Sequence, residues 1–370
     1  MGITIGPGQF QDVNSSSAAG WVTIDGGGLQ FIETGAYAWF TTINDGGEQE
    51  VATGGHAFGT TINAGGVQYD SGIATSTTLD GASWNYAKQF VGPSGYANET
   101  VINYGIQYVA GVADNTNINA GGEQIIWSGG TANNTAVYAS GWQVVDSGTT
   151  YWTTVYAEGL QFVDKGSIAY YTTVDGDALH LGVMEVEAGG IADTTTINYH
   201  GGQDVYGMAK NTTVNGGEQA IWSGGGAIGT VVKGGGLELV GAGGVAVNTT
   251  LNPNATERVQ AGGTADGVTF TSTNALLDLD TANSLTGPIS GFEFADQIDL
   301  RNVQFGAGTT FNFSQGVLTV SDGSTVAKLS LLGQYTNADF SLSSDGHGGT
   351  FINGTQEQLG GIIVNPLHFS

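Results

Sequence analysis

The sequence contains no cysteine, only 5 prolines and only 7 lysine and arginine residues among 370. Without cysteine the chain cannot form disulfides, so its stability must come from packing and from any bound ions. Acidic residues number 33, and the net charge of −26 repels nucleic-acid phosphates and anionic lipids. We therefore exclude nucleic acid and anionic membranes as partners, whereas divalent cations would be attracted.

Long hydrophobic segments are also missing. No apolar run is long enough to span a bilayer, and no basic segment followed by an apolar one opens the chain at Met1. We expect no membrane insertion and no amino-terminal export signal. Three alternatives stay open: the signal lies at the other end, the chain stays inside the cell, or the sequence starts on a trimmed protein.

Glycine, in contrast, is abundant, with 64 residues that recur at regular intervals. Between residues 8 and 260 the chain repeats one unit of about nineteen residues fourteen times, roughly G-x-Q-x-V-x-x-G-G-x-A-x-x-T-T-I-N-x-G-G. Such a period indicates a solenoid, in which each repeat buries its apolar side only against its neighbours. The glutamine position of the unit is filled by Gln11, Gln30, Gln49, Gln68, Gln89, Gln107, Gln124, Gln143, Gln161, Met184, Gln203, Gln219, Glu238 and Glu257.

Alternation within each unit predicts β-strands. The patterns Gln-x-Val and Thr-x-Ile favour two short strands per coil, with glycine pairs at the corners because glycine adopts a positive φ at little cost. Valine, isoleucine and alanine positions fill a narrow interior. We therefore predict an all-β fold, a parallel, right-handed β-helix of about 14 coils over residues 1–270, with coils about 4.8 Å apart.

From residue 271 the nineteen-residue period is lost, although alternating strands and Asp-Gly turns continue. A solenoid needs its open end covered, since unpaired strand edges recruit other chains. We predict that residues 271–370 form a β cap that also carries export information. Residues 1–10 are too short to cap the other end, so we expect end-to-end association with further copies.

The repeats resemble those of AIDA-type autotransporter passengers, the family of diffuse-adherence adhesins. The segment GGEQEVATGGHAFGTTINAGGVQ at residues 46–68 matches that repeat in period, glycine corners, and glutamine and Thr-Thr-Ile positions, and the likeness covers about two thirds of the chain. The resemblance implies a β-helix at the cell surface that acts in adhesion, aggregation or biofilm formation. The large membrane barrel that ends autotransporters does not follow the repeats.

The tail instead is similar to the C-terminal segments of type I-secreted proteins of alphaproteobacteria. The likeness is carried by GFEFADQIDL, VSDG, LGQYT and SSDGHGGTFI. It implies an uncleaved C-terminal export signal, which agrees with the missing amino-terminal one. Asp296 and Asp345 resemble the calcium-binding turns of such proteins, although the full nonapeptide repeat is absent.

In a solenoid, equivalent residues of successive coils line up in columns. The position after the core valine should point outward, and over six coils it places carboxylates between aromatic residues. Tyr151, Trp152, Tyr170 and Tyr171 should pair across two adjacent coils. The outward column reads Trp127, Asp146, Asp164, Glu187, Tyr206 and Trp222.

This strip allows several chemistries. Aromatic faces and carboxylates together suit a polysaccharide. The candidate glycan contacts are Trp127, Tyr151, Trp152, Tyr170, Tyr171, Tyr206 and Trp222. Stacked carboxylates should raise the pKa of one member or hold a cation, and Asp146, Asp164 and Glu187 suit calcium. The same three are candidate catalytic residues, because carboxylates about 5 Å apart can perform retaining glycoside hydrolysis. A solvated acidic surface without ligand is the plain alternative.

Two function classes remain. The first is a secreted or cell-surface adhesin or matrix protein that associates with itself or with glycans. The second is a polysaccharide-active β-helix enzyme, a lyase, hydrolase or glycosyl transferase, with its groove over the middle coils. The uniform repeats and the lack of a convergent catalytic set favour the first.

Overall fold

The computed structural model describes residues 2–271 and 273–355. The chain divides into two compact units, residues 1–210 and 211–370, each described here by itself. Within the described ranges the regular structure is β-strand apart from two short 3-10 helices, η1 (Ala282–Ser284) and η2 (Asn337–Asp339). No helix in these ranges has the length and apolar character needed to cross a membrane.

Each coil of the first unit has three strands rather than the two that the sequence pattern predicted. In one coil they are β8 (Glu48–Val51), β9 (His56–Phe58) and β10 (Thr61–Asn63). We call them the glutamine, alanine and isoleucine strands after the inward residues Gln49, Ala57 and Ile62. The additional strand forms because Ala57 is flanked by two outward side chains and so continues the alternation.

Eleven glutamine strands belong to the described part of the first unit. They are β2 (Phe10–Val13), β5 (Leu29–Ile32), β8, β11 (Val67–Asp70), β14 (Ala87–Val91), β17 (Gly105–Val109), β20 (Glu123–Ile126), β23 (Trp142–Val145), β26 (Leu160–Val163), β29 (Gly182–Val186) and β32 (Gly201–Val205).

The alanine strands are β3 (Ala18–Gly20), β6 (Tyr37–Trp39), β9, β12 (Ile73–Thr75), β15 (Tyr96–Asn98), β18 (Val112–Asp114), β21 (Thr131–Asn133), β24 (Thr149–Tyr151), β27 (Ile168–Tyr170), β30 (Ile191–Asp193) and β33 (Met208–Lys210). The isoleucine strands are β1 (Ile3–Ile5), β4 (Val22–Ile24), β7 (Thr42–Ile43), β10, β13 (Thr78–Asp80), β16 (Val101–Asn103), β19 (Asn117–Ile118), β22 (Ala136–Val137), β25 (Thr154–Val155), β28 (Thr173–Val174) and β31 (Thr196–Ile197).

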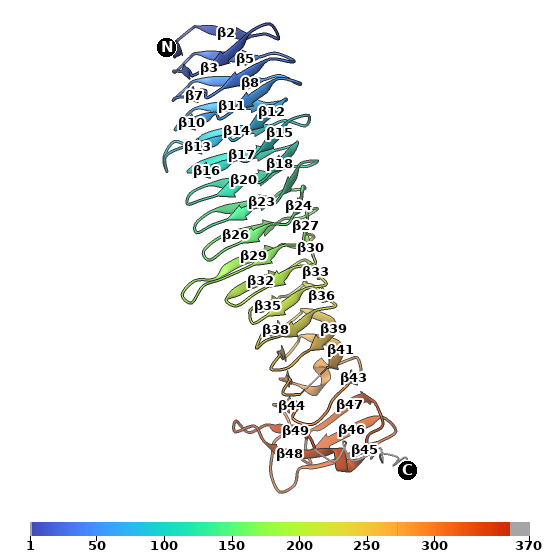
Figure 1. Ribbon diagram of the computed structural model, residues 1–370. Helices are drawn as coiled ribbons and strands as arrows, with labels where there is room; N and C mark the ends of the chain where they lie inside the picture. The colour runs from blue at the N-terminus through green and yellow to red at the C-terminus, as the bar shows by residue number, and fades with distance from the viewer. Residues whose placement is uncertain (1, 272, 356–370) are drawn as a thin grey trace, which may run out of the picture. The chain divides into compact units, whose positions relative to one another are not determined.

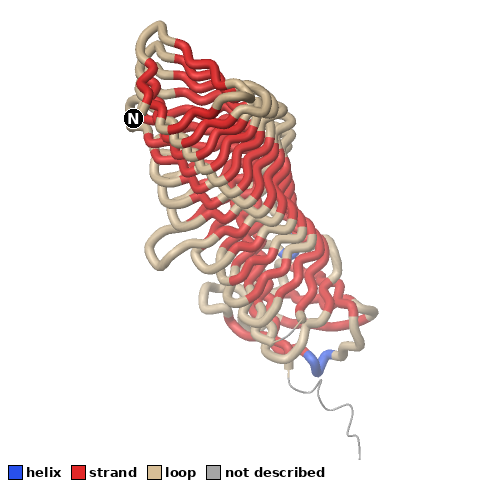
Figure 2. Tube along the Cα trace, turned by 45° about the horizontal axis from the view of Figure 1, so that its top comes forward, coloured by secondary structure: helices blue, strands red, loops and turns tan. Residues whose placement is uncertain are grey.

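Strands of one kind pair in parallel and in register from coil to coil. Gln49 of β8 lies opposite Gln30 of β5 and Gln68 of β11, and Ala57 lies opposite Ala38. Figure 1 shows the glutamine strands of the first unit stacked one below another, and in Figure 2 the strands form continuous rows between loops. The predicted parallel β-solenoid is therefore confirmed.

The interior is filled by apolar side chains that come from all three strands of each coil. In the coil of β8 to β10, Val51 and Ile62 are fully buried and Ala57 is 1% exposed. Burial of an aliphatic side chain contributes about 1.5–3 kcal/mol, so the repeated coils supply the main stabilisation. The corners leave no room for a side chain at Gly47, where a Cβ would lie 2.5 Å from the carbonyl oxygen of Ile24.

The glutamine side chains point inward and form an amide ladder, a role that sequence reasoning did not predict. Gln49 Nε2 donates to Gln30 Oε1 at 2.6 Å, and Gln68 Nε2 donates to Gln49 Oε1 at 2.6 Å. The Thr60 hydroxyl also donates to Gln49 Oε1, at 3.2 Å. An amide both donates and accepts, so a column of glutamines can hydrogen-bond head to tail in a dry interior.

The second unit continues the parallel pairing over five glutamine-type strands. These are β35 (Glu218–Ile221), β38 (Leu237–Val240), β40 (Thr256–Val259), β42 (Leu276–Leu279) and β44 (Gln297–Leu300). The sequence counted about 14 coils, and the described strands give sixteen turns. The difference arises because β42 and β44 stack in parallel without the repeat motif. The remaining strands of these turns are β34 (Thr213–Asn215), β36 (Gly226–Ile228), β37 (Val231–Lys233), β39 (Val245–Leu251), β41 (Thr264–Phe270) and β43 (Ile289–Ser290).

The last strands pair antiparallel. β45 (Thr310–Ser314) pairs with β46 (Val317–Ser321), which pairs with β47 (Val326–Leu332), and β48 (Phe340–Ser344) pairs with β49 (Thr350–Gly354). β49 also pairs antiparallel with β44. Residues 356–370 of the predicted cap lie outside the described residues, and a domain boundary at residue 270 stays a prediction.

Candidate functional site

The predicted acidic residues occupy successive rungs of the first unit. The backbone N–H of Asp146, Asp164 and Glu187 each donates to a core residue of the preceding coil, at 2.8, 3.0 and 3.0 Å. Tyr206 continues the series with a bond of 2.8 Å to the carbonyl of Val186. The three carboxylates therefore line up along the outside of the solenoid, and we call them the acidic column.

Burial and the neighbouring charges act on the pKa values of this column. Burial, and then the charges of Asp146 and Glu187, raise the pKa of Asp164. Burial raises the pKa of Glu185 as well, followed by the charge of Glu187 and of Asp204. The expectation that stacking raises the pKa of one carboxyl group stays a prediction, since burial is the largest cause of the shift at Asp164.

The chemistry of the acidic column stays a prediction. Its carboxylate oxygens are the ligand type that calcium prefers. Among residues 2–271 and 273–355, however, no three His, Cys, Asp or Glu side chains are arranged as a ready metal site. Catalysis would further need a carboxylic acid and a carboxylate on opposite sides of a sugar bond.

Four predicted aromatic residues form one cluster, which we call the aromatic corner cluster. The rings of Tyr151 and Tyr170 stack at 5.1 Å between centroids, and those of Trp152 and Tyr171 stack at 5.7 Å. Trp152 is 57% exposed and Tyr171 47% exposed. The cluster therefore offers wide aromatic surface to solvent.

The backbone under this cluster is left-handed, as it is at the equivalent corner of the other coils of the first unit. Trp152 and Tyr171 have φ values of 53° and 56°, in the left-handed region, at a corner where another coil has Gly59. A bulky residue in that region costs roughly 1–3 kcal/mol. The two rings are exposed and therefore recover little of that cost by packing, and a role for them in binding stays a prediction.

Trp127 follows β20 and occupies the rung before Asp146, since its N–H donates to the carbonyl of Val109 at 2.8 Å, and its ring joins a series of rings on the glutamine strands. Its ring lies 4.9 Å from that of Tyr108, which stacks at 4.7 Å on Phe90, which stacks at 5.2 Å on Tyr69. We call these four residues the outer aromatic ladder. Trp222, another predicted glycan contact, follows β35 in the second unit and is not one of these four residues.

The two predicted tail residues serve as backbone caps. Asp296 is fully buried and accepts from the N–H of Ala275 and of Glu293, at 3.1 and 3.0 Å. Asp345 accepts from the N–H of His347 and of Gly349. These bonds explain why the side chains are aspartates in tight turns, and calcium binding by either stays a prediction.

Sequence reasoning missed a second exposed ring pair at the same kind of corner. Trp21 and Phe40 stack at 4.6 Å, are 68% and 51% exposed, and have φ values of 56° and 54°. It also missed Tyr104, which has a φ of 48° at a corner where neighbouring coils place Gly65 and Gly121. For Tyr104 the signal was available, because a bulky residue stands where the repeat has glycine, whereas Trp21 and Phe40 stand at a variable position of the repeat.

No family model matches the chain, and no curated protein matches it by sequence. Among solved structures, a hyper-glycosylated fragment of TibA, modified by TibC, is 34% identical. The match covers 77% of this chain and 98% of the fragment, with a TM-score of 0.62. A mutant tailspike protein of E. coli bacteriophage HK620 is 11% identical over 96% of this chain and 84% of that one, and its TM-score of 0.23 supports no argument.

The TibA fragment is the passenger of an AIDA-type autotransporter adhesin, and it matches this chain at a level that establishes kinship. The predicted repeat resemblance is therefore confirmed, while the predicted type I secretion segment is not shown by the comparison. This chain belongs to the family of AIDA-type autotransporter passenger β-helices.

Proposed function

We propose that this chain is a cell-surface or secreted adhesin that binds glycans through the aromatic corner cluster. The observation that carries the proposal is the pair of exposed ring stacks, Tyr151 on Tyr170 and Trp152 on Tyr171. Aromatic faces stack on the apolar faces of sugar rings, and the outward polar groups of neighbouring coils can accept sugar hydroxyls. Kinship with an adhesin passenger supports display outside the cell.

A glycan array probed with the whole chain tests this function. Trp152→Gly and Tyr171→Gly should each weaken binding at least tenfold, because each removes a ring while glycine suits the left-handed corner. Trp39→Ala is the matched control, since Trp39 is an outward aromatic residue of β6, 37% exposed, outside the cluster. Unchanged binding by both glycine variants would contradict the proposal.

Self-association is a second candidate, and the outer aromatic ladder favours it. Tyr69 and Trp127 are 42% and 39% exposed, and the rings between them give a continuous apolar strip along one face. Apolar strips of this kind mark interaction surfaces. Light scattering should show larger particles for the parent chain than for Tyr69→Lys, and equal sizes would count against association here.

Light scattering also tests whether calcium binds to the acidic column. If calcium binds across Asp146, Asp164 and Glu187, its addition should neutralise the mutual repulsion and promote association. Chelation should reverse the effect, and Asp164→Asn should remove it.

Export by the type I route is supported only by the resemblance of the tail. Comparing the secretion of the whole chain with that of a chain lacking residues 356–370 would test it.

A further inference from the structure

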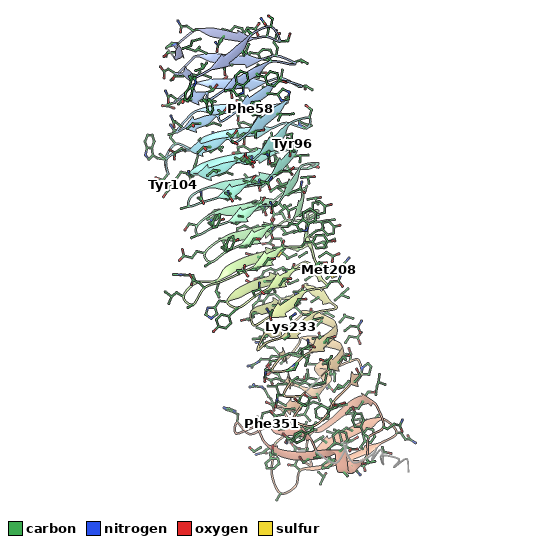
Figure 3. All side chains as sticks on the ribbon, viewed as in Figure 1. Phe58, Tyr96, Tyr104, Met208, Lys233 and Phe351 are labelled. Atoms are coloured by element: carbon green, nitrogen blue, oxygen red, sulfur yellow. The ribbon has the colours of Figure 1, made fainter. Side chains whose placement is uncertain are left out.

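A groove of about 510 Å³ lies in the first unit at the corner between isoleucine and glutamine strands. It is separate from the aromatic corner cluster and from the acidic column. Figure 3 labels one of its residues, Tyr104, at the edge of the coils. We call it the corner groove and define it by the residues that carry its chemistry, Tyr86, Tyr104, Gly121, Glu123, Trp142 and Glu158.

Two insertions into the repeat flank this corner. Residues 81–86 separate β13 from β14 and include Tyr86, which lines the groove. Residues 175–181 separate β28 from β29, and there the His180 Nε2 lies 2.9 Å from the Glu158 carboxylate. Between β14 and β29 lie five strand steps, or about 24 Å, which is room for an extended oligomer.

The floor of the groove carries exposed rings. Tyr104 is 42% exposed and Trp142 49% exposed. A Cβ on Gly121 would approach the Tyr104 ring to 2.4 Å, so the ring lies against the bare glycine of the next coil. Exposed rings along a solvated groove can stack on the faces of sugar rings.

Three groove positions depart from the glycine of the repeat. Tyr104, Ser140 and Glu158 have φ values of 48°, 59° and 61°, whereas Gly46 and Gly65 occupy the same corner in earlier coils. These three left-handed side chains all line the groove, and His200, with a φ of 58°, shows that the same corner also takes a side chain in a coil outside it. Such an outlier is a reason to look for function at the site.

The groove is acidic and lacks a resident cation beside Glu123. Glu123 lies in register with Trp142, is partly buried, and forms no ion pair within the described residues. A carboxylate withdrawn from water next to an exposed tryptophan is a suitable partner for an ammonium group, which aromatic faces also attract. An acidic sugar would be repelled.

We propose that the corner groove binds an oligosaccharide with free amino groups, its rings on Tyr104 and Trp142 and its ammonium groups beside Glu123 and Glu158. This goes beyond the proposed function, since the site and the charge of the ligand differ from those of the aromatic corner cluster. Either site can therefore fail without the other.

Titration calorimetry of the whole chain with chitosan pentamer, and with the same pentamer fully N-acetylated, tests the proposal. The two ligands share their rings and differ in charge. The free amine form should bind at least tenfold more tightly. Equal affinity for both, or no binding of either, would overturn the charge assignment and with it the proposal.

Variants locate the site. Trp142→Ala and Tyr104→Gly should each lower affinity at least tenfold, and Tyr104→Gly restores the corner glycine, so lost binding cannot be attributed to misfolding. Glu123→Gln should weaken the free amine form and leave the acetylated one unchanged. Trp39→Ala, which lies outside both sites, should have no effect. Binding that survives both ring variants, or oligolysine that binds as tightly as chitosan, would refute an amino-sugar site.

Discussion

The interior columns of the two units differ although their backbones are alike. In the first unit the inward position of the glutamine strands forms an amide ladder, in which Gln107 Nε2 donates to Gln89 Oε1 at 2.8 Å and Gln124 Nε2 to Gln107 Oε1 at 2.7 Å. In the second unit the same position holds Glu238 and then Glu257, which lie opposite each other and are fully buried.

The two columns differ in the hydrogen-bond donors that their side chains provide. An amide has donors and an acceptor, whereas an ionised carboxylate only accepts. The Thr249 hydroxyl donates to Glu238 Oε2 at 2.7 Å, but both oxygens of Glu257 lack a partner within the described residues. Burial raises the pKa of Glu238 to about 7, and burial together with the charge of Glu238 raises the pKa of Glu257. A protonated pair fits the column, and an ionised pair does not.

The largest expected effect comes from placing a glutamate in the amide ladder of the first unit. Gln107→Glu would bury a carboxylate between two amides and should lower the free energy of unfolding around β17 by about 3 kcal/mol or more at pH 8. Hydrogen exchange of β17 measures the change. Gln107→Met, which copies the natural Met184, is the milder control, and a glutamate variant as stable as the parent at pH 8 would refute the ladder's importance.

The repeat made much of this fold predictable. Its period fixed parallel stacking and placed Val51 and Ile62 inside, because an alternating strand has only two faces. It also brought Asp146, Asp164 and Glu187 to successive rungs. Burial of the glutamines was not foreseen, because a polar residue ordinarily signals a surface and the ladder exists only once coils stack.

Other features needed the three-dimensional structure. The alanine strand was not predicted, although its alanines were expected in the interior, because three residues around Ala57 give too short a pattern. β42 and β44 were missed as coils because Leu277 and Ile298 replace the glutamine and erase the motif. The corner groove combines an insertion at residues 81–86 with rings from several coils, and no single segment reveals it.

The reverse exchange should have the next largest effect. Glu238→Gln with Glu257→Gln extends the amide ladder and removes two groups that ionise unfavourably. At pH 8 we expect the second unit to gain about 3 kcal/mol, the value of a pKa raised from 4.5 to about 7 at Glu238. Hydrogen exchange of β38 and β40 measures the gain. At pH 4, where the acids are protonated in both states, the gain should be much smaller, and an equal gain at both pH values would contradict this cause.

The smallest expected effect concerns the one break in the ladder of the first unit. Gln203 Nε2 lies 3.2 Å from Met184 Sδ, a weak acceptor. Met184→Gln should replace this contact with an amide hydrogen bond and stabilise β29 by about 1 kcal/mol. Met184→Leu is the control of similar volume and should not stabilise. If Met184→Gln lowers the stability of β29 instead, the amide ladder cannot be continued through this strand, and the prediction is wrong.

The most direct test of the account is the pH dependence of local opening in the unmodified chain. Because the folded pKa of Glu238 is raised, its stabilising contribution is complete below pH 4.5 and is lost as the pH rises through about 7. Hydrogen exchange, corrected for intrinsic exchange rates, should therefore show β38 and β40 losing protection between pH 5 and pH 8, while β17 and β23 of the amide ladder keep theirs. Asp70 of β11 is also buried, with a pKa raised to about 7, so β11 should follow the second unit. Equal pH dependence in all five strands would contradict the account.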